Sequence, residues 1–128
     1  MKDREWVAKW LSKAQGDLLV AQHVFYEFNP KQLDISCYHC QQSAEKALEA
    51  YLTFQEYNFP YTHDLRQLCQ LCMNFDNSFS GLLDDCFDLM PYAAQTRYPA
   101  MHDIEEAETE SALNKAERIL KAVASLIS

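Results

Sequence analysis

The chain has 128 residues, 48% of them hydrophobic, which is enough to bury the core of one domain. Its formal net charge is −8, from 19 acidic and 11 basic residues, and this balance argues against extensive nonspecific binding to nucleic acid, which depends on Lys and Arg. With two glycines and four prolines, long helices with few connections are expected rather than a fold of many tight turns.

The N-terminal stretch MKDREWVAKW carries charges where a secretory signal has an apolar segment of about 7–15 residues. No run approaches the roughly 20 apolar residues of a membrane-spanning helix. The five cysteines are an odd number without a secretory context, so we expect reduced thiols. Together these features predict a cytoplasmic protein without a membrane anchor.

A first helix is predicted from about residue 4 to residue 28 by apolar residues that recur every three or four positions. Lys9, Lys13 and Asp17 fall on the opposite side. Gly16 lies inside this helix at a cost of roughly 1 kcal/mol, so we expect a neighbouring helix to approach it closely. The predicted inward stripe is Trp6, Trp10, Ala14, Leu18, Ala21 and Phe25.

A second helix is predicted from about residue 33 to residue 57. Its outward face is expected to carry Gln42, Glu45, Lys46 and Glu49. Gln41 falls on the inward face, where an unpaired amide is unfavourable, so it should find a partner on another helix. The other inward positions are Cys37, Cys40, Ala44, Ala47, Leu48, Tyr51 and Leu52.

A third helix is predicted from Thr62, as the N-cap, with His63 and Asp64 as further capping residues. Its predicted inward residues are Leu65, Leu68, Cys69, Cys72 and Phe75. After a break at residues 77–80, a fourth helix should end near Pro91 with inward residues Leu82, Leu83, Phe87 and Met90.

Asp103 and Glu106 have the spacing of a capping box and predict the start of the last helix. The stripe of this helix is Ala112, Ala116, Ile119, Val123 and Leu126. Amphipathic helices joined by short connections bury their stripes best when they pack antiparallel. The predicted fold is therefore all-α, an up-and-down antiparallel bundle of four to five helices, with residues 1–128 as a single domain.

Two CxxC pairs, Cys37/Cys40 and Cys69/Cys72, raise the alternative of a zinc site, since four thiolates can form a tetrahedral site. Both pairs lie inside predicted helices, where a spacing of three places two small apolar side chains on one face. We therefore expect them in the core, and no metal is predicted. Most aromatic residues should also be core, with a surplus at residues 54–61 as an apolar patch for a second subunit or partner protein.

Several segments together resemble one family. They are WLSKAQGDLLVAQ, CYHCQQSAEKALEAYL, THDLRQL and TRYP ahead of an alanine-rich acidic helix. In this order they are similar to the HEPN domain, named for higher eukaryotes and prokaryotes nucleotide-binding. The resemblance implies a helical bundle that usually forms a homodimer, and a frequent partnership with a small nucleotidyltransferase, often as a toxin–antitoxin pair.

Among HEPN proteins, RNases carry an arginine and a histidine separated by four to six residues near the start of the last helix, and Arg97 and His102 match that spacing. In this hypothesis His102 is the general base for a ribose 2′-hydroxyl and Arg97 stabilises the phosphate, without metal. The sequence departs from the RNase pattern at Tyr98 and Ile104. It is similar instead to the branch with an Arg-Tyr-Pro loop, where RNase activity is not implied.

Two hypotheses follow. In the first, the chain is a nucleotidyltransferase partner with nucleotide or protein recognition around the Arg97 loop, and with Gln41, Arg97 and Tyr98 as nucleotide-binding candidates. It needs no cofactor, and a nucleotide is its candidate ligand. In the second, the chain is a metal-independent endoribonuclease toxin that uses Arg97 and His102, with RNA as its substrate. The charge between residues 84 and 110 argues against the second, because eight acidic residues there surround Arg97 as the only Lys or Arg.

Overall fold

The structure, a computed structural model, describes residues 3–94 and 103–128. All regular elements in these residues are helical, so the predicted all-α class is confirmed. In chain order they are α1 (Arg4–Glu27), α2 (Leu33–Phe54), α3 (Leu65–Met73), the 3₁₀ helix η1 (Asn77–Leu82), α4 (Leu83–Leu89), the 3₁₀ helix η2 (Met90–Tyr92) and α5 (Glu106–Ile127).

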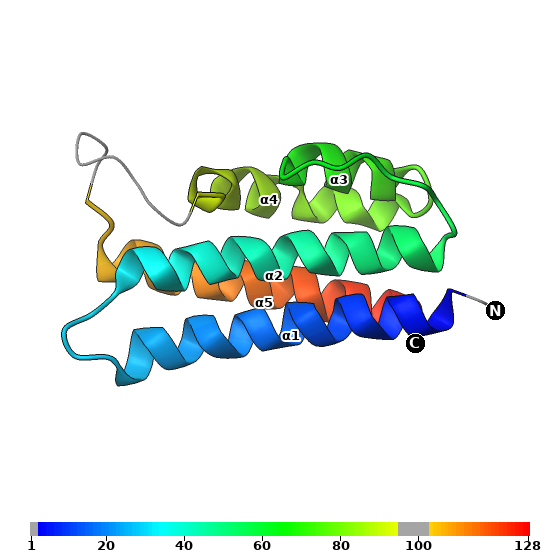
Figure 1. The fold of residues 1–128 in the computed structure, drawn as a ribbon. Coiled ribbons are helices and arrows are strands. Elements are labelled where there is room, and N and C mark those ends of the chain that lie inside the picture. The colour runs from blue at the N-terminus through cyan, green and yellow to red at the C-terminus, as the bar shows by residue number, and fades with distance from the viewer. Residues whose placement is uncertain (1–2, 95–102) are drawn as a thin grey trace.

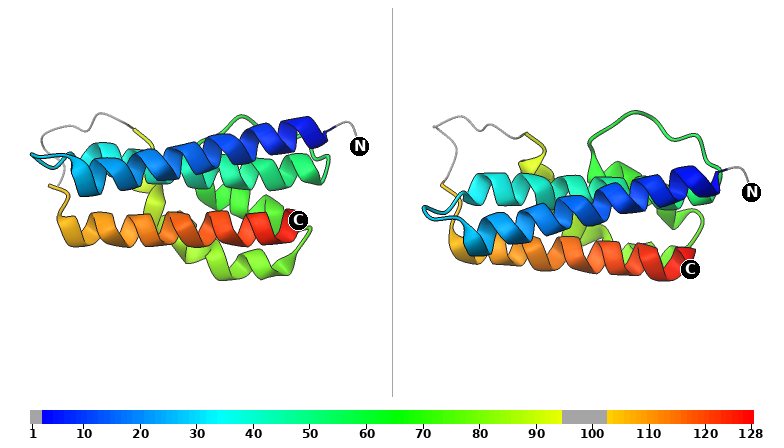
Figure 2. Two further views of the ribbon diagram at one scale, coloured as in Figure 1. Left: turned by 90° about the horizontal axis from the view of Figure 1, so that it is seen from below. Right: turned by 60° about the horizontal axis from the view of Figure 1, so that its bottom comes forward.

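The helices form a bundle with α2 at its centre (Figure 1). The long helices α1 and α5 lie against α2 and against each other, whereas α3, η1 and α4 cover another side of α2 (Figure 2). This arrangement confirms the predicted bundle of four to five helices. Among the described helices, none combines the length and the apolar character that crossing a membrane requires.

Contacts on several sides bury α2 almost all round. Every inward residue predicted for this helix is buried, but Glu45 and Glu49, predicted to face solvent, are each only 6% exposed. The prediction for these two residues was wrong because it assumed one apolar stripe, the pattern of a helix that is covered on one side only. Lys46 and Gln42 are half-buried.

Two serine hydroxyls join α2 to α1. Ser36 Oγ donates to the carbonyl of Ala21 and Ser43 Oγ donates to the carbonyl of Ala14, each at 2.8 Å. All four residues are buried. Because the hydroxyls find backbone acceptors on the neighbouring helix, small polar residues can occupy this contact without an unsatisfied group.

At the N-terminal end of α1, the buried residues differ from the predicted inward stripe. Ala14, Leu18, Ala21 and Phe25 are buried as predicted, whereas the side chain of Trp6 is 56% exposed and Val7 is buried in its place. No heavy atom beyond the local backbone lies within 4 Å of the position that a Cβ on Gly16 would occupy. The expected close approach of a helix to Gly16 is therefore wrong.

The connection from α2 to α3 returns along α2. The carbonyl of His63 lies 3.4 Å from Gln41 Nε2, and Cys72 Sγ lies 3.8 Å from the carbonyl of Leu48, so α3 runs in the same direction as α2. The N-cap of α3 is Asp64, whose carboxylate accepts a hydrogen bond from the backbone N–H of Gln67 at 3.1 Å.

The predicted start of α3 is corrected accordingly. Thr62 does not cap the helix, because its hydroxyl oxygen instead accepts from the backbone N–H of Asp64 at 3.0 Å, within the turn that precedes the helix. Phe75, predicted to face inward, is 42% exposed because α3 ends at Met73.

The fourth helix has a different register from the prediction. Its fully buried residues are Cys86 and Leu89, while Phe87 is exposed and lies under the guanidinium of Arg66. The helix begins directly after η1. When a helix starts at a different residue from the one predicted, different residues lie on its buried face. Leu82, Leu83 and Met90 are only partly buried.

The last helix begins at Glu106, not at the predicted Asp103. Its N-cap is Glu105, which makes no side-chain capping bond, so the predicted capping box does not form. Ala112, Ala116, Ile119 and Val123 are buried as predicted, and Leu126 is partly buried.

All five cysteines are buried, free thiols. The thiol of Cys69 lies 3.4 Å from the carbonyl of Phe79, and Cys72 contacts the carbonyl of Leu48. The prediction that both CxxC pairs belong to the core is confirmed, since each pair faces the interior from within a helix.

Gly16 provides a test of the fold. Replacing it with alanine should raise the free energy of unfolding by about 1 kcal/mol, because the site is an exposed helix interior with room for a methyl group. The measurement is chemical denaturation monitored by circular dichroism. The exposed neighbour Gln15→Ala is the control and should change stability much less; no gain for Gly16→Ala would contradict the open environment described here.

Candidate functional site

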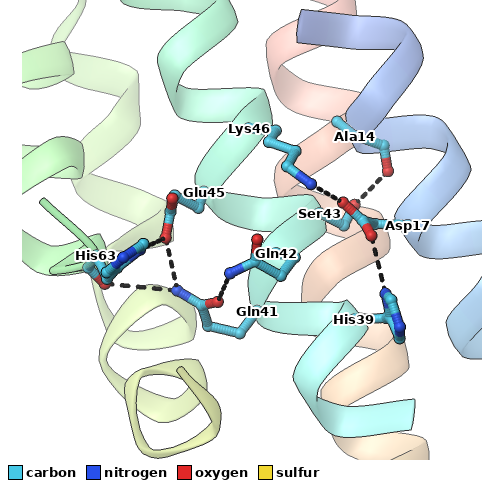
Figure 3. Close-up of polar contacts among 9 residues, drawn as sticks. All are labelled: Ala14, Asp17, His39, Gln41, Gln42, Ser43, Glu45, Lys46 and His63. Carbon is cyan, nitrogen blue, oxygen red and sulfur yellow. Dashed lines mark hydrogen bonds and ion pairs between the residues drawn. The ribbon is translucent and has the colours of Figure 1, made fainter. Parts of the chain in front are cut away.

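Three of the four residues proposed from sequence, namely Arg97, Tyr98 and His102, lie outside the described residues. The fourth, Gln41, is fully buried in α2. The candidate site in the described part of the chain is therefore the group of polar side chains around Gln41 on α2 (Figure 3).

The side-chain amide of Gln41 is held by three partners (Figure 3). Its Nε2 donates to Glu45 Oε1 at 3.0 Å and to the carbonyl of His63 at 3.4 Å, and its Oε1 accepts from Gln42 Nε2 at 2.7 Å. The expected partner on another helix is replaced by residues of α2 itself and by the returning loop. Because both donors and the acceptor are engaged, the amide is satisfied within the fold.

His63 and Glu45 form a carboxylate–imidazole pair. His63 Nδ1 lies 2.9 Å from Glu45 Oε1, and the imidazole is 53% exposed while the carboxylate is buried. Since Glu45 engages Nδ1, Nε2 is the ring nitrogen that this pair leaves for a hydrogen bond to a ligand. His63 was predicted as a capping residue, and its contact with Glu45 could not be foreseen because the two residues are 18 positions apart.

Glu49 lies one turn after Glu45 and is equally buried. Burial raises the pKa of the Glu49 carboxyl to about 7, and the charge of Glu45 acts in the same direction, whereas His63 and Lys46 oppose the rise. Two carboxylates on one covered helix face repel each other, so Glu49, which has no ion pair among the described residues, retains its proton near neutral pH.

A second polar group lies on the flank of α2 that faces α1 (Figure 3). Asp17 Oδ1 lies 2.8 Å from His39 Nδ1, and Asp17 Oδ2 accepts from Lys46 Nζ at 2.5 Å. The sequence placed Asp17 and Lys46 on solvated faces, and only the packing of α1 on α2 brings them together. Their contact fastens the two helices with a partly buried charge pair.

Each of these two groups holds an imidazole by Nδ1 against a carboxylate, which fixes the orientation of the ring. Within residues 3–94 and 103–128, no three or more His, Cys, Asp and Glu side chains are arranged to hold a metal ion.

Part of the acidic surface that the sequence predicted near residue 97 is paired with α5. Both carboxylate oxygens of Asp85 accept from Arg118, each at 2.9 Å, and Asp88 lies 3.0 Å from Lys115. Tyr92 donates to Glu108. These contacts join η2 and α4 to α5 and use several of the acidic groups that the sequence had counted against RNA binding.

Comparison with known proteins gives a consistent picture. Residues 7–126 match the family described as HEPN domain. Among solved structures, the crystal structure of ST0689, an archaeal HEPN homologue, is similar with a TM-score of 0.74 and 25% identity over 95% of this chain and 98% of that one. The TT1696 protein of Thermus thermophilus is similar with a TM-score of 0.79 and 25% identity, over 93% and 96% of the two chains. No curated protein matched.

The raised pKa of Glu49 predicts how stability depends on pH. Between the ordinary pKa of a glutamate, 4.5, and the raised pKa of about 7, the folded state holds a proton that the unfolded state has lost, so this group lowers stability as the pH rises through that window. Glu49→Gln should remove the fall and be more stable than the parent by roughly 2 kcal/mol at pH 8, with little difference at pH 5.

The measurement is urea denaturation of parent and variant at both pH values, compared as a difference. The exposed Glu110→Gln is the matched control and should show no such pH-dependent gain. An equal effect of Glu49→Gln at pH 5 and pH 8 would show that the carboxyl is ionised in both conditions.

Proposed function

The chain belongs to the HEPN family, and from this premise we propose that it is a homodimeric partner of a small nucleotidyltransferase, with nucleotide or protein recognition around the Arg97 loop. The observation that carries the proposal is the family match over residues 7–126 together with the Arg97-Tyr98-Pro99 sequence. That loop sequence is similar to the HEPN branch in which RNase activity is not implied. A toxin–antitoxin-like pairing is the setting in which such a partnership would act.

The described residues support this proposal through the architecture on both sides of the loop. η2, the last described element before it, packs against α2, the helix that carries Gln41. Asp85 and Asp88 of α4, the helix that leads into η2, form ion pairs with α5, the helix that follows the Arg97 segment. The elements before and after this segment are therefore joined to the bundle. A rigid frame of this kind is what a recognition loop needs. In the proposal, Arg97 contacts the anionic part of a nucleotide or of the partner, and Tyr98 stacks beside it.

The partnership predicts co-purification. Where a small nucleotidyltransferase gene adjoins the gene for this chain, co-expression should yield a complex that survives size-exclusion chromatography. Arg97→Ala should weaken it at least about tenfold, as loss of an interface arginine does, whereas Arg66→Ala, on the surface of α3, should not. Separate elution of the two unaltered proteins would contradict the proposal.

The second candidate is a metal-independent RNase, favoured by the spacing between Arg97 and His102. If it holds, purified protein cleaves RNA in the presence of EDTA, and His102→Ala reduces the rate by at least about a hundredfold through loss of the general base. His23→Ala, an exposed histidine on α1, is the control. The proposed partner role predicts no cleavage above background by the unaltered protein, so this assay separates the two functions.

A further inference from the structure

The start of α1 and the end of α2 lie at the end of the bundle away from the start of α5 (Figure 1). Residues of these two helix ends line a groove. It has a volume of about 320 Å³, and the described residues of its lining combine aromatic rings with carboxylates and include no lysine or arginine. The lining residues are Asp3, Trp6, Trp10, Thr53, Glu56, Tyr57, Asn58 and Phe59.

The aromatic rings of the groove come from separate elements and are held in place by packing. Trp10 of α1 and Phe59 of the α2–α3 connection meet edge to face, with ring centroids 6.4 Å apart. Tyr57 is packed in the same manner against Phe75, at 5.7 Å. Trp6 is the most exposed of the four groove aromatics, and the ammonium of Lys9 lies 4.7 Å from its ring centroid.

Glu56 occupies a backbone conformation that side chains rarely adopt. Its φ is +56°, in the left-handed region, and it follows α2 at the position where glycine is usual. The bonds of this helix end run from Tyr57 N to the Leu52 carbonyl at 3.0 Å and from Glu56 N to the Thr53 carbonyl at 2.9 Å. A non-glycine residue there costs roughly 1 kcal/mol.

Asp3 is the second carboxylate of the groove. It stands at the N-cap of α1, yet its side chain makes no capping bond, although aspartate usually caps from this position. In the described part of the chain, neither Asp3 nor Glu56 has a side-chain hydrogen bond or ion pair. Two carboxylates without cationic partners therefore border four aromatic rings.

We propose that this groove binds the trimethylammonium group of a small organic cation. Such a group is weakly hydrated, so it gains from the faces of tryptophan and tyrosine rings, and the two carboxylates complement its charge. Lys9 and Lys13 lie on the adjoining surface beside Trp6 and Trp10, where they repel a second positive charge. That repulsion favours a single cationic group over a polyamine. The site is independent of the Arg97 loop.

The two tryptophans of the chain both line the groove, so tryptophan fluorescence excited selectively responds to binding there, and the variants below assign the response to individual groove residues. Titration with choline should change the fluorescence in a saturable way, with a Kd of roughly 10 mM or tighter. The neutral isostere 3,3-dimethyl-1-butanol, in which carbon replaces the charged nitrogen, should give no saturable change. Sodium chloride at equal ionic strength controls for screening.

Variants test the assignment of residues, with binding followed by broadening of the choline methyl resonances. Glu56→Gln and Asp3→Asn should each weaken binding about twofold to fivefold, as loss of one exposed charge does. Trp6→Ala should weaken it more than about fivefold through loss of the cation–π contact. Glu27→Gln removes an exposed carboxylate at the far end of α1 and should leave binding unchanged.

Glu56→Gly distinguishes a binding defect from a folding defect. It relieves the left-handed strain, so the thermal midpoint should rise while choline binding falls. A trimethyllysine peptide, titrated in parallel, shows whether a free metabolite or a modified side chain is the better source of the group. Equal responses to choline and to its neutral isostere would overturn the proposal, and so would unchanged choline binding in folded Trp6→Ala or Glu56→Gln protein.

Discussion

The burial of α2 on nearly all sides is the constraint on which the rest of the structure depends. A helix in this position cannot leave a polar side chain in water, so each polar group on it needs a partner from a neighbouring element. Ser36 and Ser43 bond to carbonyls of α1, and Gln41 bonds to Glu45 and to the returning loop. The polar residues of α2 thus determine which groups of α1 and of the α2–α3 connection form hydrogen bonds with it.

The same constraint explains where titratable groups accumulate. Asp17 with Lys46 and His39 joins α1 to α2, and His63 with Glu45 joins the loop ahead of α3 to α2. Glu49 forms no ion pair with a described residue, and burial raises its pKa. Polar, titratable side chains that lie close together and are partly covered are also typical of binding sites. In this fold, their contacts join α2 to α1 and to the loop ahead of α3.

Among the described residues, function is therefore expected where side chains are not engaged in packing. The family match supports the proposal for the Arg97 loop. At the end of the bundle where α1 begins, the groove of Trp6, Trp10 and Glu56 is built from side chains that are not part of the buried core. A fold of this kind serves as a rigid support, and the chemistry of the exposed ends decides what it binds.

The sequence by itself determined that the chain forms amphipathic helices and which stripes face inward on α2 and α5, because helical periodicity is a local property. It also placed both CxxC pairs in the core. Only the tertiary structure decided that Glu45 and Glu49 are buried, that Trp6 is exposed, and that Asp17 meets His39 and Lys46. Those outcomes depend on how many other elements cover a helix, and the connection after α2 that turns back along this helix is one such element. Because the contacting residues are distant in the sequence, no local pattern indicates the contact.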